Sequence, residues 1–154
     1  MALIKLNNQS LSAVTSAGLP SGSVLQVVSN FTTADVHTTS TTFEATGLSA
    51  SITPTSASSK IFVIVSIPSW YCDTNNARAT VFRDTTNIGN GDTGLMQIYA
   101  NAAYAPSTTQ VMDSPSSASS LVYSVHIRVV TGGSSYVSYS TYGHFTITLM
   151  EIAG

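Results

Sequence analysis

The stretch Leu121-Val122-Tyr123-Ser124-Val125-His126-Ile127-Arg128-Val129-Val130 alternates between two kinds of side chain. Its odd-numbered positions are all apolar or aromatic, whereas its even-numbered positions include Ser124, His126 and Arg128. Because successive side chains of a β-strand point to opposite faces, this period of two predicts a strand with one buried face. A second stretch, Ile61-Phe62-Val63-Ile64-Val65, is apolar throughout. We expect it centrally, either inside a sandwich or between a sheet and a partner subunit.

The rest of the chain from Val24 onward has the same character. β-Branched and aromatic residues recur in short segments separated by Gly, Pro, Asn and Asp, which is typical of many short strands joined by turns, and no helical period is present. We therefore predict an all-β fold, an antiparallel β-sandwich that is jelly-roll-like, with about ten short strands. Pro68 is expected to end one strand ladder. The predicted strands are 23–29, 40–46, 48–53, 60–69, 77–83, 95–101, 108–113, 120–130, 134–141 and 143–152.

The first 22 residues follow neither the strand period nor the helix period, and glycine and proline close the segment between positions 18 and 22. The sequence thus predicts an extended N-terminal arm (1–22) followed by one β-sandwich domain (23–154). Two roles stay open for the arm. It could drape over a neighbouring protein, with apolar side chains filling pockets, or it could be an additional edge strand or a frayed terminus. The candidate partner-binding side chains of the arm are Leu3, Ile4, Leu6, Leu11 and Val14.

Charged residues make up only 8% of the chain, against about 25% in a typical soluble domain. With 25 Ser and 21 Thr, the polar surface is built from hydroxyl groups. A net charge of −2 with 5 Lys+Arg predicts no direct nucleic-acid binding. No apolar run approaches the ~20 residues of a membrane span, and we expect no export signal. The single cysteine, Cys72, rules out an internal disulfide and a multi-cysteine metal site.

The edges of the predicted strands carry almost no Lys, Glu or Pro, the residues that usually protect strand edges. Segment 40–53 contains only Glu44, and segment 134–142 has no charged residue. The edges could be short and twisted. We favour the alternative, in which edges and apolar faces are covered in an obligate oligomer.

The residues also argue against catalysis. No Gly-x-Ser-x-Gly motif occurs, and the only Glu residues, Glu44 and Glu151, have no evident carboxylate partner for glycoside hydrolysis. The segment 84–92 offers oxygen ligands but lacks EF-hand spacing, and His126 and His144 lack an evident third metal ligand. We predict no enzymatic activity, no cofactor and no metal.

Aromatic and amide side chains in three predicted loops, 70–76, 84–94 and 101–107, are candidates for a receptor or partner surface. Tyrosine and tryptophan could present aromatic faces to a carbohydrate, although both are also common in cores and interfaces. The candidate residues are Trp70, Tyr71, Asn75, Asn87, Asn90, Asp92 and Tyr104.

Four phrases along the chain carry a resemblance: Ser51-Ile52-Thr53-Pro54-Thr55-Ser56-Ala57-Ser58-Ser59-Lys60-Ile61, Val81-Phe82-Arg83-Asp84-Thr85-Thr86-Asn87-Ile88-Gly89, Asp113-Ser114-Pro115-Ser116 and Thr146-Ile147-Thr148-Leu149-Met150-Glu151-Ile152. In this order, and with the start Leu6-Asn7-Asn8-Gln9-Ser10, the chain resembles small virion proteins of tailed bacteriophages, particularly those of cyanobacterial and other aquatic hosts. The resemblance implies a homotrimeric β-sandwich without catalytic residues.

Domains of this kind occur as cement or decoration proteins on capsids and at the receptor-binding ends of tail fibres. A fibre tip usually follows a long shaft, whereas this sequence passes from a short arm directly into its one predicted domain. We therefore expect a capsid cement protein that assembles in the host cytoplasm and binds the major capsid protein on the outer capsid surface of the virion. The alternative is a tail-fibre tip that recognises host-surface carbohydrate.

Overall fold

The computed structural model of the chain describes residues 18–73, 76–138 and 143–154. One sheet, here called sheet I, has the strand order β1-β13-β4-β10, and every neighbouring pair is antiparallel. The second, sheet II, has the order β3-β11-β6-β7, with β8 also paired to β6. The strands of sheet I are β1 (Val24–Thr32), β4 (Lys60–Ile67), β10 (Ser107–Asp113) and β13 (Phe145–Ile152); those of sheet II are β3 (Glu44–Ile52), β6 (Asn76–Arg83), β7 (Thr86–Asn87), β8 (Met96–Tyr99) and β11 (Leu121–Val129).

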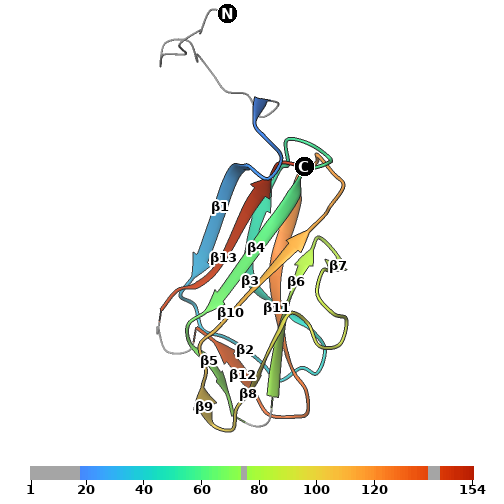
Figure 1. Ribbon diagram of the computed structural model, residues 1–154. Helices are drawn as coiled ribbons and strands as arrows, with labels where there is room; N and C mark the ends of the chain where they lie inside the picture. Colours follow the sequence, from blue (N-terminus) through green and yellow to red (C-terminus); the bar gives the residue numbers. More distant parts are fainter. Residues whose placement is uncertain (1–17, 74–75, 139–142) are drawn as a thin grey trace, which may run out of the picture.

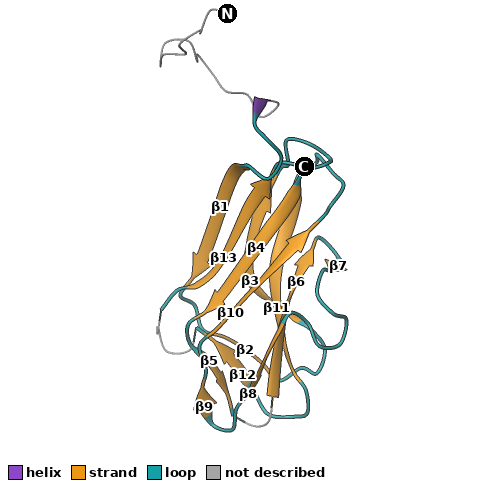
Figure 2. Ribbon diagram, viewed as in Figure 1, coloured by secondary structure: helices purple, strands orange, loops and turns teal. Residues whose placement is uncertain are grey.

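The order in which the chain visits the two sheets is that of a jelly roll. Strands β1, β4, β10 and β13 belong to sheet I, and β3, β6, β8 and β11 belong to sheet II, so the chain repeatedly crosses from one sheet to the other. Figure 2 shows strands throughout the body of the molecule, and its described residues contain no α-helix. The predicted all-β, jelly-roll-like sandwich is therefore confirmed.

A third, smaller sheet closes one end of the sandwich, and we call it the end sheet. Its order is β2-β12-β5-β9, with bounds β2 (Val36–Thr38), β5 (Trp70–Cys72), β9 (Ala103–Tyr104) and β12 (Ser135–Val137). Each of these strands comes from a different connection between the two large sheets: β1 to β3, β4 to β6, β8 to β10, and β11 to β13. Figure 1 shows the end sheet at the opposite end of the sandwich from the C-terminus.

The core lies between sheets I and II, and strict alternation of side chains creates it. On β4, Ile61, Val63, Val65 and Ile67 are buried, whereas Phe62 and Ile64 are only half-buried on the outer face. β4 lies between β13 and β10, as the apolar stretch predicted. The alternation of β11 is also confirmed, because Leu121, Tyr123, Val125, Ile127 and Val129 all face the core.

Several predicted strand boundaries were wrong for local backbone reasons. The predicted strands 40–46 and 48–53 are one strand, β3, because Gly47 adopts a positive φ of 82° and its neighbours form a bulge against β11 rather than a turn. In the described part of predicted strand 134–141, the strand covers Ser135–Val137, and Ser138 follows with a φ of 58°. Residues 139–141 lie outside the described residues. Pro68 ends the β4 ladder as predicted. The short strands β2, β5, β7 and β9 were not predicted.

A partly buried ion pair links the two large sheets at one edge of the sandwich. Arg83 Nη1 on β6 donates to both carboxylate oxygens of Asp113 on β10, at 2.7 and 2.6 Å, and Tyr123 Oη on β11 donates to Asp113 Oδ2 at 2.7 Å. Hydrogen bonding to the carboxylate raises the pKa of Arg83. Burial and the adjacent carboxylate raise the pKa of Tyr123. Asp113 therefore holds one strand of sheet I to two strands of sheet II.

We expect Asp113→Ala to destabilise the protein, because it leaves the Arg83 guanidinium and the Tyr123 hydroxyl without their common acceptor. The loss should be about 2–3 kcal/mol, below that of a fully buried pair, because the Arg83 side chain is 21% exposed. Urea unfolding at a fixed protein concentration measures it. Asp92→Ala, on an exposed loop, is the matched control and should change stability by less than about 0.5 kcal/mol. Equal losses for the two variants would contradict the role of Asp113.

Candidate functional site

Four aromatic rings lie side by side on the outer face of the end sheet, and we call them the aromatic row. They belong to Tyr104, Tyr71, Tyr136 and His37, which occupy directly opposed positions on β9, β5, β12 and β2. Ring centroids are 4.9 Å apart for Tyr71 and Tyr104, 5.8 Å for Tyr71 and Tyr136, and 5.4 Å for His37 and Tyr136. Since one ring comes from each of four chain connections, the row exists only in the folded protein.

The opposite face of the end sheet explains why these rings point outward. Trp70, Cys72, Ser135 and Val137 are fully buried and belong to the end of the sandwich core. The Trp70 indole Nε1 donates to Ser135 Oγ at 2.8 Å, so the buried donor is satisfied by the neighbouring strand. With a side-chain period of two, burial of Trp70 and Cys72 directs Tyr71 to the outer face.

The strands that carry the aromatic row have no lysine or arginine, and acidic residues flank two of them. The four strands of the end sheet contain no Lys or Arg, whereas Asp35 and Asp73 directly flank β2 and β5 in the sequence. Asp73 Oδ1 accepts a 2.6 Å hydrogen bond from the Ser134 backbone N–H, which ties the carboxylate to the start of β12. This composition disfavours phosphates and other anions and leaves hydroxyl-bearing neutral ligands compatible with the surface.

Tyr71 and Tyr104 are the predicted site residues that the structure brings together, and Tyr104 is 51% exposed. Trp70 was also predicted in a ligand-presenting loop, and this was wrong. It lies on β5 with no exposed surface, because Trp70 and Cys72 share the face of β5 that packs against the core. Asn75 and the arm residues Leu3, Ile4, Leu6, Leu11 and Val14 lie outside the described residues.

The predicted site residues Asn87, Asn90 and Asp92 belong to a different surface, the outer side of sheet II. Asn87 Oδ1 accepts from Thr80 Oγ1 at 2.6 Å and from the Gly89 N–H at 2.9 Å, and Asn90 pairs with Gly94 through its backbone. Arg78 Nη1 donates to the Asp92 carbonyl at 2.8 Å, and Arg128 Nη2 donates to the same oxygen. The loop is thus bound down along sheet II.

A close backbone approach holds the end of this loop. Gly94 has a φ of 68°, and a Cβ at this position would lie 2.5 Å from the Ala79 carbonyl oxygen. No other residue fits there without displacing β6. The loop 84–94 and the aromatic row are therefore separate features, although the sequence placed their residues in one candidate set.

Two residues of the aromatic row, His37 and Tyr136, were not among the predicted site residues. The periodicity of three-residue strands is too short to reveal their register. Residue type was the one feature of the sequence that could have identified them. Each of the four connections carries an aromatic or imidazole ring next to small or β-branched residues.

The outer face of sheet I forms a second candidate surface. Val27, Met150, Phe62 and Met112 stand directly opposite one another across β1, β13, β4 and β10, and we call them the apolar row. Val27 is 55% and Met112 is 48% exposed. Within the described strands of this sheet, the only charged side chain outside the core is Lys60, because Asp113 and Glu151 face inward. An exposed apolar row of this kind is compatible with a protein interface.

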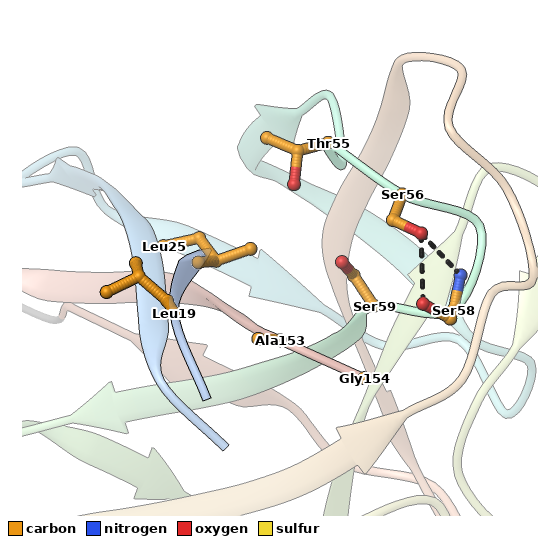
Figure 3. A pocket seen from close by; sticks show the side chains of 8 residues that line it. All are labelled: Leu19, Leu25, Thr55, Ser56, Ser58, Ser59, Ala153 and Gly154. Carbon is orange, nitrogen blue, oxygen red and sulfur yellow. Dashed lines mark hydrogen bonds between the residues drawn. The ribbon is translucent and has the colours of Figure 1, made fainter. Parts of the chain in front are cut away.

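At the end where the chain enters and leaves the sandwich, a shallow pocket of about 330 Å³ opens between hydroxyl groups and two leucines (Figure 3). Backbone hydrogen bonds of Gly22 and Ser23 with Ala153 hold both described chain ends here. The lining residues carry no titratable side chain. They are Leu19, Leu25, Thr55, Ser56, Ser58, Ser59, Ala153 and Gly154.

Beside this pocket, the buried carboxylate of Glu151 accepts hydrogen bonds from three donors. Gln26 Nε2 lies 2.6 Å from one oxygen, and the Thr55 N–H and hydroxyl lie 2.7 and 2.8 Å from the other. Burial would by itself raise the pKa of Glu151, but these hydrogen bonds outweigh it and lower the pKa. The carboxylate is thus a structural link between β1, the 53–59 connection and β13.

The lowered pKa of Glu151 predicts a stability loss in acid. Stabilisation by the carboxylate is complete above the usual glutamate pKa of about 4.3 and is lost as the pH falls through the lower folded-state value. At pH 7, Glu151→Gln should cost about 1–2 kcal/mol, and its difference from the wild type should shrink as the pH falls toward about 3. Urea unfolding over this pH range measures both. A constant difference between the two proteins would contradict the assignment.

His126, which the sequence raised as a candidate metal ligand, makes local contacts on the outer face of sheet II. The His126 ring packs against Phe82, with centroids 4.1 Å apart and the ring planes tilted by 32°, and it shares a 3.0 Å hydrogen bond with Ser124. Burial lowers the pKa of His126. No group of three or more His, Cys, Asp or Glu side chains suited to a metal occurs in the described ranges. Nor does this part of the chain contain a helix of the length and apolarity that crossing a bilayer requires.

Comparisons with protein families and with curated proteins identify no relative of this chain. No protein-family model matches the chain, and a search of curated proteins gives no match.

Proposed function

We propose that this chain is a non-enzymatic structural protein of a tailed-phage particle, a cement protein that binds the major capsid protein on the outer capsid surface as a homotrimer. The phage setting rests on the sequence resemblance described above. The observation that supports an assembled protein is the apolar row on sheet I, a continuous apolar strip across four strands with one charged side chain on its face.

In this proposal one outer face of the sandwich contacts neighbouring copies, and the other outer face contacts solvent. The face of sheet I is turned toward neighbouring copies, because its half-exposed valine, phenylalanine and methionines gain most from removal of water. The face of sheet II carries Arg78, Arg128 and the loop that they hold, and it stays exposed to solvent. Three copies with sheet I toward a common axis would cover their apolar rows.

Attachment to the capsid is assigned to the N-terminal arm. The described chain starts at the end of the sandwich that also holds Ala153 and the shallow pocket, so the arm departs from the end opposite the end sheet. Three arms on one trimer act together, and weak contacts of single arms then give a strong attachment. Bound trimers add contact free energy to the capsid lattice and so oppose the pressure of packaged DNA.

The assembly surface can be tested with charged substitutions at exposed positions. We expect the wild type to sediment as a trimer and Val27→Lys combined with Met112→Lys to sediment as a monomer, because each lysine would be desolvated in the interface. Val122→Lys is the matched control, since Val122 is 41% exposed on the outer face of sheet II. A monomeric wild type, or an unchanged trimer in the double variant, would contradict the proposal.

The arm can be tested by deleting residues 1–17, which leaves every described residue in place. The shortened chain should remain a folded trimer but should no longer bind to capsids that lack this protein, as measured by co-sedimentation and particle imaging. Full-length protein serves as the control. Undiminished capsid binding by the shortened chain would refute attachment through the arm.

The receptor-binding tip of a tail fibre is the second candidate function. The aromatic row favours it, because it places four rings at the end of the sandwich opposite the end that holds residues 18–22 and the C-terminus.

A further inference from the structure

We propose that the aromatic row is a binding site for neutral glycans, in which pyranose rings lie against Tyr71, Tyr104 and Tyr136. The inference goes beyond the cement function and does not require it, since a protein held by its arm leaves the end sheet exposed on a capsid as well as on a fibre. It gives the second candidate function a defined site and ligand class.

The first argument is the construction of the row. Four strands about 4.8 Å apart place the rings along a strip of roughly 15 Å, which is long enough for an oligosaccharide rather than a single sugar. Their centroid separations of 4.9, 5.8 and 5.4 Å keep the strip continuous. Tyrosine offers a rigid apolar ring with a hydroxyl at its edge and loses little conformational entropy on binding.

The second argument is burial. In a sheet with one buried face, the apolar side chains are expected on that face, and here the inner side is already filled by Trp70, Cys72 and Val137. The outer side nevertheless carries three tyrosines and a histidine, of which Tyr104 and His37 are exposed. Cross-strand ring pairs add some stability to the sheet, but a sheet with a filled inner face does not require four of them.

The third argument is charge, and it selects the ligand class. Nucleic acids and anionic glycans need cations, and no Lys or Arg occurs in the four strands that build the row. The flanking carboxylates of Asp35 and Asp73 would repel such ligands but can accept hydrogen bonds from sugar hydroxyls. Aromatic rings on strands that carry no cation therefore fit a neutral, polyhydroxylated ligand.

The experiment uses the full-length protein on an array of neutral oligosaccharides of hexoses, deoxyhexoses and N-acetylhexosamines, printed beside sialylated and sulfated glycans. Affinities for bound glycans are then measured by titration calorimetry. We expect binding of at least one neutral oligosaccharide and a loss of about tenfold or more in affinity for Tyr104→Leu and for Tyr71→Ala. Tyr104→Leu keeps an apolar side chain on the edge strand, so it separates loss of the ring from loss of folding.

The control is Tyr99→Ala, which removes a 79% exposed ring on β8 outside the row and should leave affinity unchanged. Three results would overturn the inference: no neutral glycan bound, binding restricted to anionic glycans, or an affinity that Tyr104→Leu does not change. An equal loss for Tyr99→Ala would also overturn it. Capsid binding by the same variants should be normal, so failure of this inference is distinguishable from failure of the arm-dependent attachment.

Discussion

Burial of Trp70 is the constraint on which the end of the molecule depends. A tryptophan can lie fully buried only where its indole N–H finds an acceptor, and here Ser135 Oγ on the neighbouring strand supplies it at 2.8 Å. This contact brings the β4–β6 and β11–β13 connections together at the end of the core. The pairing of β5 with β12, and then of β2 and β9 with these two, follows from it. Four connections that would otherwise be separate loops thus form a sheet.

The outer faces of the two large sheets differ in whether the chain itself covers them. Sheet II is overlaid by its own loop, which the two arginines and the close approach of Gly94 to β6 hold in place. Sheet I has no such cover among the described residues, and its apolar row stays half-exposed. A chain with so few charges cannot protect that face by electrostatic repulsion, and the proposal of an assembled protein starts from this exposed apolar row.

The sequence predicted the long strands well because their periodicity extends over many residues. The alternation of 121–130, the apolar run 61–65 and Pro68 all have the predicted structural meaning. The end sheet was not predicted, because strands of two or three residues are too short for a period and their pairing depends on contacts between distant connections. Tyr71 and Tyr104 were recognised by residue type alone. Trp70 was misplaced since the same chemical signal describes a core tryptophan. His37 was missed because its only signal was an imidazole ring next to β-branched residues, without a period to place it.

The aromatic row also bears on how such a protein can diversify. Each of its rings is supplied by a separate connection, and none of the four belongs to a strand of the two large sheets. A substitution or length change in one connection would alter one part of the surface while the jelly roll and the other three positions keep their geometry. Variation at this end is therefore modular, whereas variation in the core rows is constrained by close packing.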